Sequence, residues 1–163
     1  MLAAIEAHLG SEQVSRVIYG AIIGMALIVT LEKHPPEAGV VIASILGTAL
    51  AVALAELYSD IVGAETRTHT RVARARIRKF AEAAGAVAFG IAFPAVFFLL
   101  AAAGAMEVAT AFTAAKWSGL GLIAIYGFVG AQLSGRSLPA SLLHALAVGL
   151  IGGFLIGLKA LLH

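Results

Sequence analysis

The stretch AAGAVAFGIAFPAVFFLLAAAGAM, residues 83–106, contains 24 consecutive residues without an Asp, Glu, Lys or Arg. A helix that crosses the hydrocarbon core of a bilayer needs about 20 mostly apolar residues, so this stretch is long enough to span a membrane. Each uncharged run of this kind is expected to be helical, since a strand would leave backbone N–H and C=O groups without partners in lipid. Four further uncharged runs occur elsewhere in the chain, over residues 17–31, 38–55, 117–135 and 137–158.

These runs predict an all-α integral membrane protein with five transmembrane helices. One membrane domain is expected over residues 16–163, preceded by an amphipathic helix at the membrane interface over residues 1–15. Pro35-Pro36 predicts a tight turn between the first two spans, because proline cannot continue a helix. The five spans are expected at about residues 16–32, 38–62, 82–106, 116–135 and 138–160.

The composition supports a membrane protein and excludes several other classes. Of the 163 residues, 61% are hydrophobic and only 12% are charged, and the mean hydropathy is +0.99. A soluble chain of this length could not bury so much apolar surface. The absence of cysteine excludes a disulfide scaffold and thiolate chemistry. No nucleophile, zinc or phosphate-loop motif of a known enzyme class occurs, so we expect neither an enzyme nor a bound cofactor.

A basic segment over residues 64–81 predicts the orientation in the membrane. Because cytoplasmic loops are enriched in Lys and Arg, this segment is expected to be a cytoplasmic loop, with the N-terminus inside and the C-terminus outside a prokaryotic plasma membrane. Such segments bind anionic lipid headgroups, and we expect no nucleic-acid partner. Its cations are Arg67, Arg71, Arg74, Arg76, Arg78 and Lys79.

Small residues at helical spacing predict close helix packing, within one chain or between two. They occur in the first span at Gly20 and Gly24, in the second around Gly47, and in the fifth from Gly149 to Gly157. Pro94 interrupts the third span and predicts a kink, which could serve packing alone or act as a hinge.

Polar residues within the spans are the candidates for an ion path. Glu56 and Asp60 are four residues apart and therefore share one helix face, where two carboxylates could bind a proton or a metal cation. Alternatively, the second span ends near Ala55 and both acids are solvated. His144 and Tyr19 lie within the fifth and first spans and could contribute to the path or be ordinary packing residues.

Charged residues at the other end of the spans have simpler interpretations. Glu32, His34 and Glu37 cluster around the turn between the first two spans, where they could collect a metal ion or simply be solvated. Lys116-Trp117 is typical of an interface anchor, with the indole at headgroup depth and the ammonium in water.

Several stretches resemble the vacuolar iron transporter family: Arg16–Gly24 (RVIYGAIIG), Phe89–Pro94, Gly130–Ser137 and the glycine-rich fifth span. The resemblance covers roughly residues 14–160 and implies that family's five-helix bundle, a homodimer and a divalent metal as cargo. Two features depart from the family. Ile23 stands where the family has an aspartate, and the basic segment replaces a cytoplasmic metal-binding domain rich in glutamate and methionine.

The sequence and the resemblance together lead to one main hypothesis. The protein is expected to transport a cation, such as iron(II) or manganese(II), with or without coupling to protons. Alternatively, it has kept the fold but lost the metal path, and acts as a structural or interaction protein. A third hypothesis is an anion or lipid pathway that depends on the basic segment.

Overall fold

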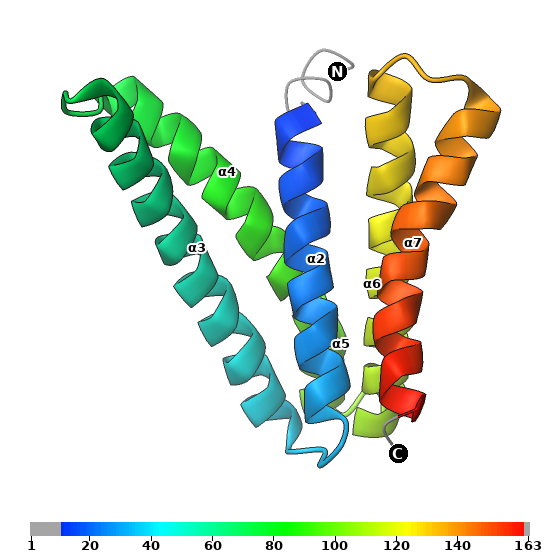
Figure 1. Ribbon diagram of the computed structural model, residues 1–163. Helices are drawn as coiled ribbons and strands as arrows, with labels where there is room; N and C mark the ends of the chain where they lie inside the picture. The colour runs from blue at the N-terminus through cyan, green and yellow to red at the C-terminus, as the bar shows by residue number, and fades with distance from the viewer. Residues whose placement is uncertain (1–10, 162–163) are drawn as a thin grey trace.

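The computed structural model describes residues 11–161, and within that range helices joined by short turns form all the regular secondary structure, with no strand (Figure 1). The predicted all-α class is thereby confirmed. Of the predicted interfacial segment 1–15, residues 1–10 lie outside the described residues, and residues 11–15 form the start of α2. The helices are α2 (Ser11–Leu31), α3 (Ala38–Thr68), α4 (Arg74–Ala92), α5 (Ala95–Ala102), α6 (Val108–Leu133) and α7 (Leu138–Leu161).

The described helices include three that are long and apolar enough to cross a membrane, namely α2, α3 and α6. A fourth span is formed if α4 and α5, which meet at a bend of 49°, are taken together. Pro94 lies at this bend as the N-cap residue that precedes α5, where the kink was predicted. Within the described part of α7, the apolar stretch Leu138–Leu150 is shorter than a span, so the fifth span remains a prediction.

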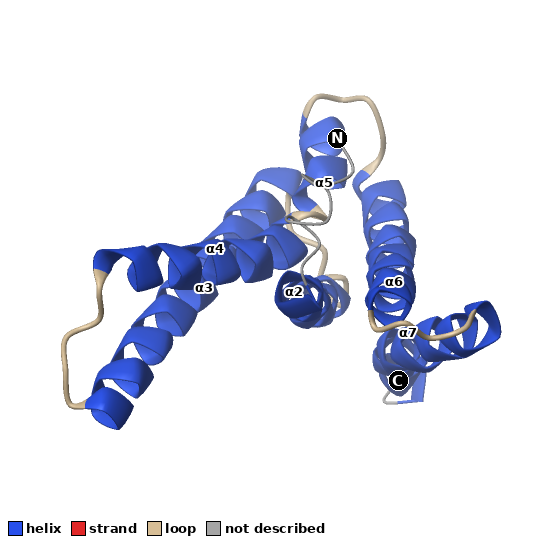
Figure 2. Ribbon diagram, turned by 90° about the horizontal axis from the view of Figure 1, so that it is seen from above, coloured by secondary structure: helices blue, strands red, loops and turns tan. Residues whose placement is uncertain are grey.

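The helices form an open arrangement around α2 (Figures 1 and 2). Seen from above in Figure 2, α3 and α4 form an arm on one side of α2, and α6 and α7 form an arm on the other. α2 packs mainly against α4 and α6, and α3 packs mainly against α4. The α3–α4 and α6–α7 turns lie at the same end of the molecule, which we call the basic end because the basic segment lies there (Figure 1).

The main hydrophobic core lies away from the basic end, where α2, α3, α5 and α6 meet. Ile28, Ile45, Phe98 and Phe112 are fully buried there. The rings of Phe98 and Phe112 meet edge to face, with their centroids 4.8 Å apart. Aromatic pairs prefer this geometry because the positive ring edge faces the negative ring face.

A glycine contact joins α2 to α4. A Cβ added at Gly20 would overlap the carbonyl oxygen of Val87, and one added at Gly24 would lie 2.9 Å from the carbonyl oxygen of Ile91. The predicted role of this pair in close packing is confirmed. At Gly47, and at Gly149, Gly153 and Gly157, an added Cβ would meet no described atom within 4 Å, so close packing at these glycines stays a prediction.

The basic segment 64–81 is largely helical and is not the loop that the sequence suggested. α3 continues to Thr68 and α4 begins at Arg74, so the connecting turn comprises only residues 69–73. The local sequence explains the difference, because Ala, Arg, Lys and Glu are strong helix formers and no Gly or Pro interrupts them. The turn is held by Glu65, whose Oε1 accepts a hydrogen bond from the backbone N–H of Val72 at 3.2 Å. We refer to residues 64–81 as the basic hairpin.

Candidate ion site

The two candidate carboxylates share one arginine. Arg16 of α2 donates from Nη1 to Oε2 of Glu56 and from Nη2 to Oδ2 of Asp60, the latter over 3.3 Å. The three side chains are 23–27% exposed, so they are neither fully solvated nor fully dehydrated. We call these three residues the Arg16 cluster. When all three are ionised, two carboxylates and one guanidinium leave one net negative charge.

The helical spacing explains how one arginine reaches both acids. Glu56 and Asp60 are one turn apart on α3 and project from the same face, toward α2. The two ends of a guanidinium carry separate donors in a fixed fork, so each can bind its own carboxylate. α2 and α3 diverge toward the basic end, and the long arginine side chain bridges the gap between them (Figure 1).

Glu56 and Asp60 lie well inside α3. Helix α3 does not end near Ala55 but continues thirteen residues further, so Glu56 and Asp60 lie within a helix and not at its frayed end. Arg16 lies at the start of the predicted first span, and its role as the partner of both acids was not predicted from the sequence. The signal was present, since a lone cation and two carboxylates near the same end of neighbouring antiparallel spans favour pairing.

The two other candidate residues, Tyr19 and His144, differ in how near they lie to these ion pairs. Tyr19 is on α2, one turn beyond Arg16, and its side chain is 47% exposed. His144 is half-buried on α7, which packs mainly against α6 in the opposite arm of the molecule. The structure therefore places Tyr19 next to Arg16 along α2 but does not bring His144 to the carboxylates.

A second ion pair lies toward the opposite end of α2. Lys116 of α6 donates from Nζ to Oε1 of Glu32 over 2.7 Å, and both side chains are about one-fifth exposed. Lys116 is therefore an ion-pair partner and not simply an interface anchor, whereas Trp117 is 67% exposed, as expected for the anchor. Ion pairs therefore lie at both ends of the uncharged run of α2, where Arg16 bonds to α3 and Glu32 bonds to α6.

The described residues contain no group of three or more His, Cys, Asp or Glu side chains that could hold a metal ion. Glu56 and Asp60 provide two carboxylates, and a divalent cation takes about six ligands when it binds oxygen. Water, backbone oxygens or a second copy of the chain would have to complete such a site.

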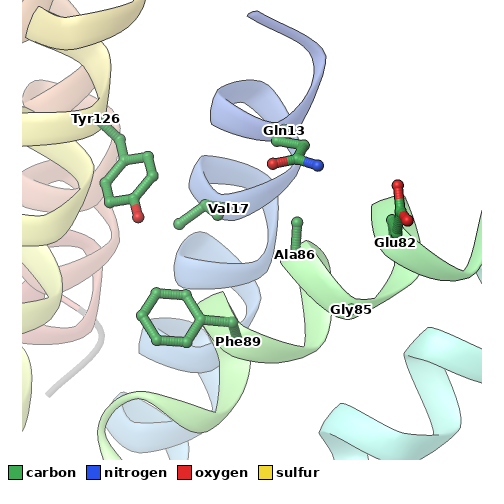
Figure 3. A pocket seen from close by; sticks show the side chains of 7 residues that line it. All are labelled: Gln13, Val17, Glu82, Gly85, Ala86, Phe89 and Tyr126. Atoms are coloured by element: carbon green, nitrogen blue, oxygen red, sulfur yellow. The ribbon is translucent and has the colours of Figure 1, made fainter. Parts of the chain in front are cut away.

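A groove lies between α2, α4 and α6, on the side of α2 away from α3. Its volume is about 590 Å³, and Figure 3 shows the rings of Phe89 and Tyr126 directed toward the space beside Val17. Gln13 and Glu82 lie nearer the basic end of the groove (Figure 3). The sequence analysis did not identify this groove, because its lining comes from three helices. It is lined by Gln13, Val17, Glu82, Gly85, Ala86, Phe89 and Tyr126.

Comparisons with known proteins provide no assignment: no protein-family model, no curated protein and no solved structure matches the chain. The likeness to the vacuolar iron transporter family therefore rests on the sequence stretches given above.

Proposed function

We propose that this protein transports a divalent cation such as iron(II) or manganese(II) across a membrane, and that the Arg16 cluster binds the cation. One observation carries the proposal: two carboxylates on one helix share a single arginine from another helix. Charged side chains are costly at membrane depth and usually serve an ion path there, which favours this interpretation over a surface ion pair.

The chemistry of the Arg16 cluster suits an exchange between cations. A cation that reaches the Arg16 cluster meets a net negative charge and carboxylate oxygens, which are ligands that manganese(II) and iron(II) accept. It competes with the Arg16 guanidinium for the same oxygens. Binding therefore requires Arg16 to release at least one carboxylate, and cation release allows the ion pair to form again.

The exchange would change the attachment of α3 to α2. These two helices pack mainly against other helices, and the arginine contacts connect them where they diverge. When Arg16 releases Glu56 and Asp60, the arm formed by α3 and α4 loses this connection. The 49° bend at Pro94 provides a place where α4 can move relative to α5.

The proposed orientation in the membrane follows from charge, and the proposed oligomeric state follows from the incomplete set of metal ligands. The basic end faces the cytoplasm of a prokaryotic cell, since Lys and Arg concentrate on that side. The protein acts as a homodimer, in which the open glycine face of α7 packs against a second copy and partner residues add ligands.

The test is uptake of manganese(II) and iron(II) into proteoliposomes, with a pH-sensitive dye inside. Wild-type protein is expected to carry at least one of these metals. Glu56→Gln should abolish uptake, whereas Glu107→Gln, which removes an exposed carboxylate elsewhere, should retain it. Equal uptake by Glu56→Gln and wild type would disprove the assignment of Glu56.

A second candidate function is supported by the same ion pairs. Arg16 satisfies both carboxylates, and no three-ligand metal group occurs among the described residues, which is what a non-transporting structural or interaction protein would show. In that case folded wild-type protein would move neither metal nor protons, and a stoichiometric membrane partner would co-purify with it.

A further inference from the structure

The groove between α2, α4 and α6 has a polarity gradient along its length. Deeper in the membrane domain its walls are apolar, with Val17, Ala86 and Phe89. Toward the basic end the lining becomes polar at Gln13 and Glu82. Such a gradient matches a molecule with an apolar chain and a polar head.

The wall that α4 contributes continues into two cations of the basic hairpin. The lining residues Glu82, Gly85 and Phe89 recur at helical spacing on one face, and Arg78 and Lys79 lie one turn before Glu82 on that face. Ten residues separate Lys79 from Phe89, which is about 15 Å along the helix. One leaflet of the hydrocarbon core is about as thick, being half of roughly 30 Å.

From these observations we propose that the groove binds an anionic phospholipid, with an acyl chain beside Phe89 and Val17 and the phosphate at Arg78 and Lys79. Basic pockets between transmembrane helices are a known type of site for anionic headgroups. The inference is independent of the proposed transport function, since none of the groove-lining residues belongs to the Arg16 cluster.

The polar contacts at the groove entrance fit this occupant. Arg78 donates from Nε to Oε1 of Glu82 over 2.9 Å, which leaves its two Nη groups to donate to a phosphate. With Glu82 offset by Arg78, Lys79 gives the entrance one net positive charge. In the described part of the chain, the side chains of Gln13 and Tyr126 make no hydrogen bond, so both can bond to ester or glycerol oxygens.

Charge also argues against a second copy of the chain as the occupant. A copy related by two-fold symmetry would bring its own Arg78 and Lys79 to the same entrance, and the like charges would repel. A zwitterionic lipid would gain less than an anionic one, because its headgroup carries no net charge for these cations to neutralise.

Two independent changes test the groove, each with a matched control. Gly85→Leu places a side chain in the groove without a clash, since an added Cβ at Gly85 meets nothing within 4 Å. Gly47→Leu is its control, because Gly47 is equally open on α3 and lies outside the groove. The double variant Arg78→Gln, Lys79→Gln removes the headgroup contacts, and Arg67→Gln, Arg71→Gln removes two other cations of the same hairpin.

Binding of phosphatidylglycerol and phosphatidylcholine is measured by native mass spectrometry of the purified full-length protein in detergent, with thermal unfolding to confirm folding. We expect a clear preference for phosphatidylglycerol. The affinity for phosphatidylglycerol should fall roughly thirtyfold in the double variant Arg78→Gln, Lys79→Gln, since each cation contributes about 1 kcal/mol. In Gly85→Leu the same affinity should fall at least about tenfold. Both controls should stay within about twofold of wild type.

Three results would overturn the proposal. If the control double variant at Arg67 and Arg71 loses as much lipid binding as the double variant at Arg78 and Lys79, the lipid is attracted by the overall charge of the hairpin and does not bind at a specific site. Displacement of phosphatidylglycerol by inorganic phosphate at equal concentration would indicate a simple anion site. A change in the monomer–dimer ratio of Gly85→Leu without a change in lipid binding would assign the groove to a second copy.

Discussion

Arg16 of α2 bonds to Glu56 of α3, forty positions later in the chain, and the pair bridges two helices that diverge toward the basic end of the molecule. Asp60 shares the same guanidinium one helical turn further along α3. The arm formed by α3 and α4 is therefore attached to α2 by two different contacts. Glycines of α2 pack closely against α4, and ion pairs connect α2 to α3.

The first prediction concerns the stability of this attachment. Arg16→Gln should lower the free energy of unfolding by about 2 kcal/mol, between the effects of exposed and buried ion pairs, because it leaves two carboxylates unpaired. The measurement is reversible unfolding in detergent micelles, with Arg71→Gln as a control that removes an exposed cation.

A double-mutant cycle separates the ion pair from general effects of substitution. Arg16→Gln combined with Glu56→Gln should destabilise by less than the sum of the two single variants, with a coupling of about 1–2 kcal/mol. Additive single effects would show that the two side chains do not interact in the folded protein.

The second prediction concerns the glycine contact. Gly20→Ala should destabilise the protein by more than about 1 kcal/mol, because the added methyl group would meet the backbone of Val87, which cannot move without shifting α4. Gly47→Ala should be neutral or stabilising by up to about 1 kcal/mol, since its Cβ has free space and alanine favours a helix. The thermal unfolding midpoints of the two variants are the measurement: the midpoint of Gly20→Ala should fall, and that of Gly47→Ala should stay the same or rise. Equal shifts in the same direction would argue against the close approach of α2 to α4.

The third prediction concerns the other end of α2. Lys116→Gln should lower the free energy of unfolding by about 1 kcal/mol, because it removes the ammonium that bonds to the partly buried Glu32. Lys33→Gln, which removes an exposed cation next to Glu32, should change stability by less than about 0.5 kcal/mol. A loss in Lys33→Gln as large as that in Lys116→Gln would mean that the effect comes from general charge.

The sequence predicts the local features of this fold well. Each uncharged run coincides largely with helix in the described residues, Pro94 marks the bend between α4 and α5, and Gly20 and Gly24 mark a close helix contact. These features depend on hydrophobicity and on the backbone properties of single residues, and the local sequence alone determines both.

Features that depend on contacts between helices were not predictable in the same way. The pairings of Arg16 with Glu56 and of Lys116 with Glu32 join positions 40 and 84 residues apart, and several arrangements of the spans would satisfy the same charges. The groove lined by Val17, Phe89 and Tyr126 likewise arises only when three helices meet. The continuation of α3 to Thr68 was not predicted, because the concentration of charge suggested a loop from residue 64 onward, although Arg and Ala favour helices.

If Glu56 and Asp60 bind a divalent cation in competition with Arg16, two substitutions should change cation affinity in opposite directions. Glu56→Gln removes a ligand, so manganese(II) affinity should fall at least about tenfold. Arg16→Gln removes the competing guanidinium, so the affinity of the same site should rise about tenfold. A purely structural ion pair predicts neither change.

The most direct measurement is a titration of purified wild-type, Glu56→Gln, Arg16→Gln and Glu107→Gln protein with manganese(II), followed by the loss of the free-ion electron paramagnetic resonance signal. The account predicts binding by wild type, weaker binding by Glu56→Gln, tighter binding by Arg16→Gln, and no change in Glu107→Gln. Absence of binding in folded wild-type protein, or one affinity for all four proteins, would contradict it.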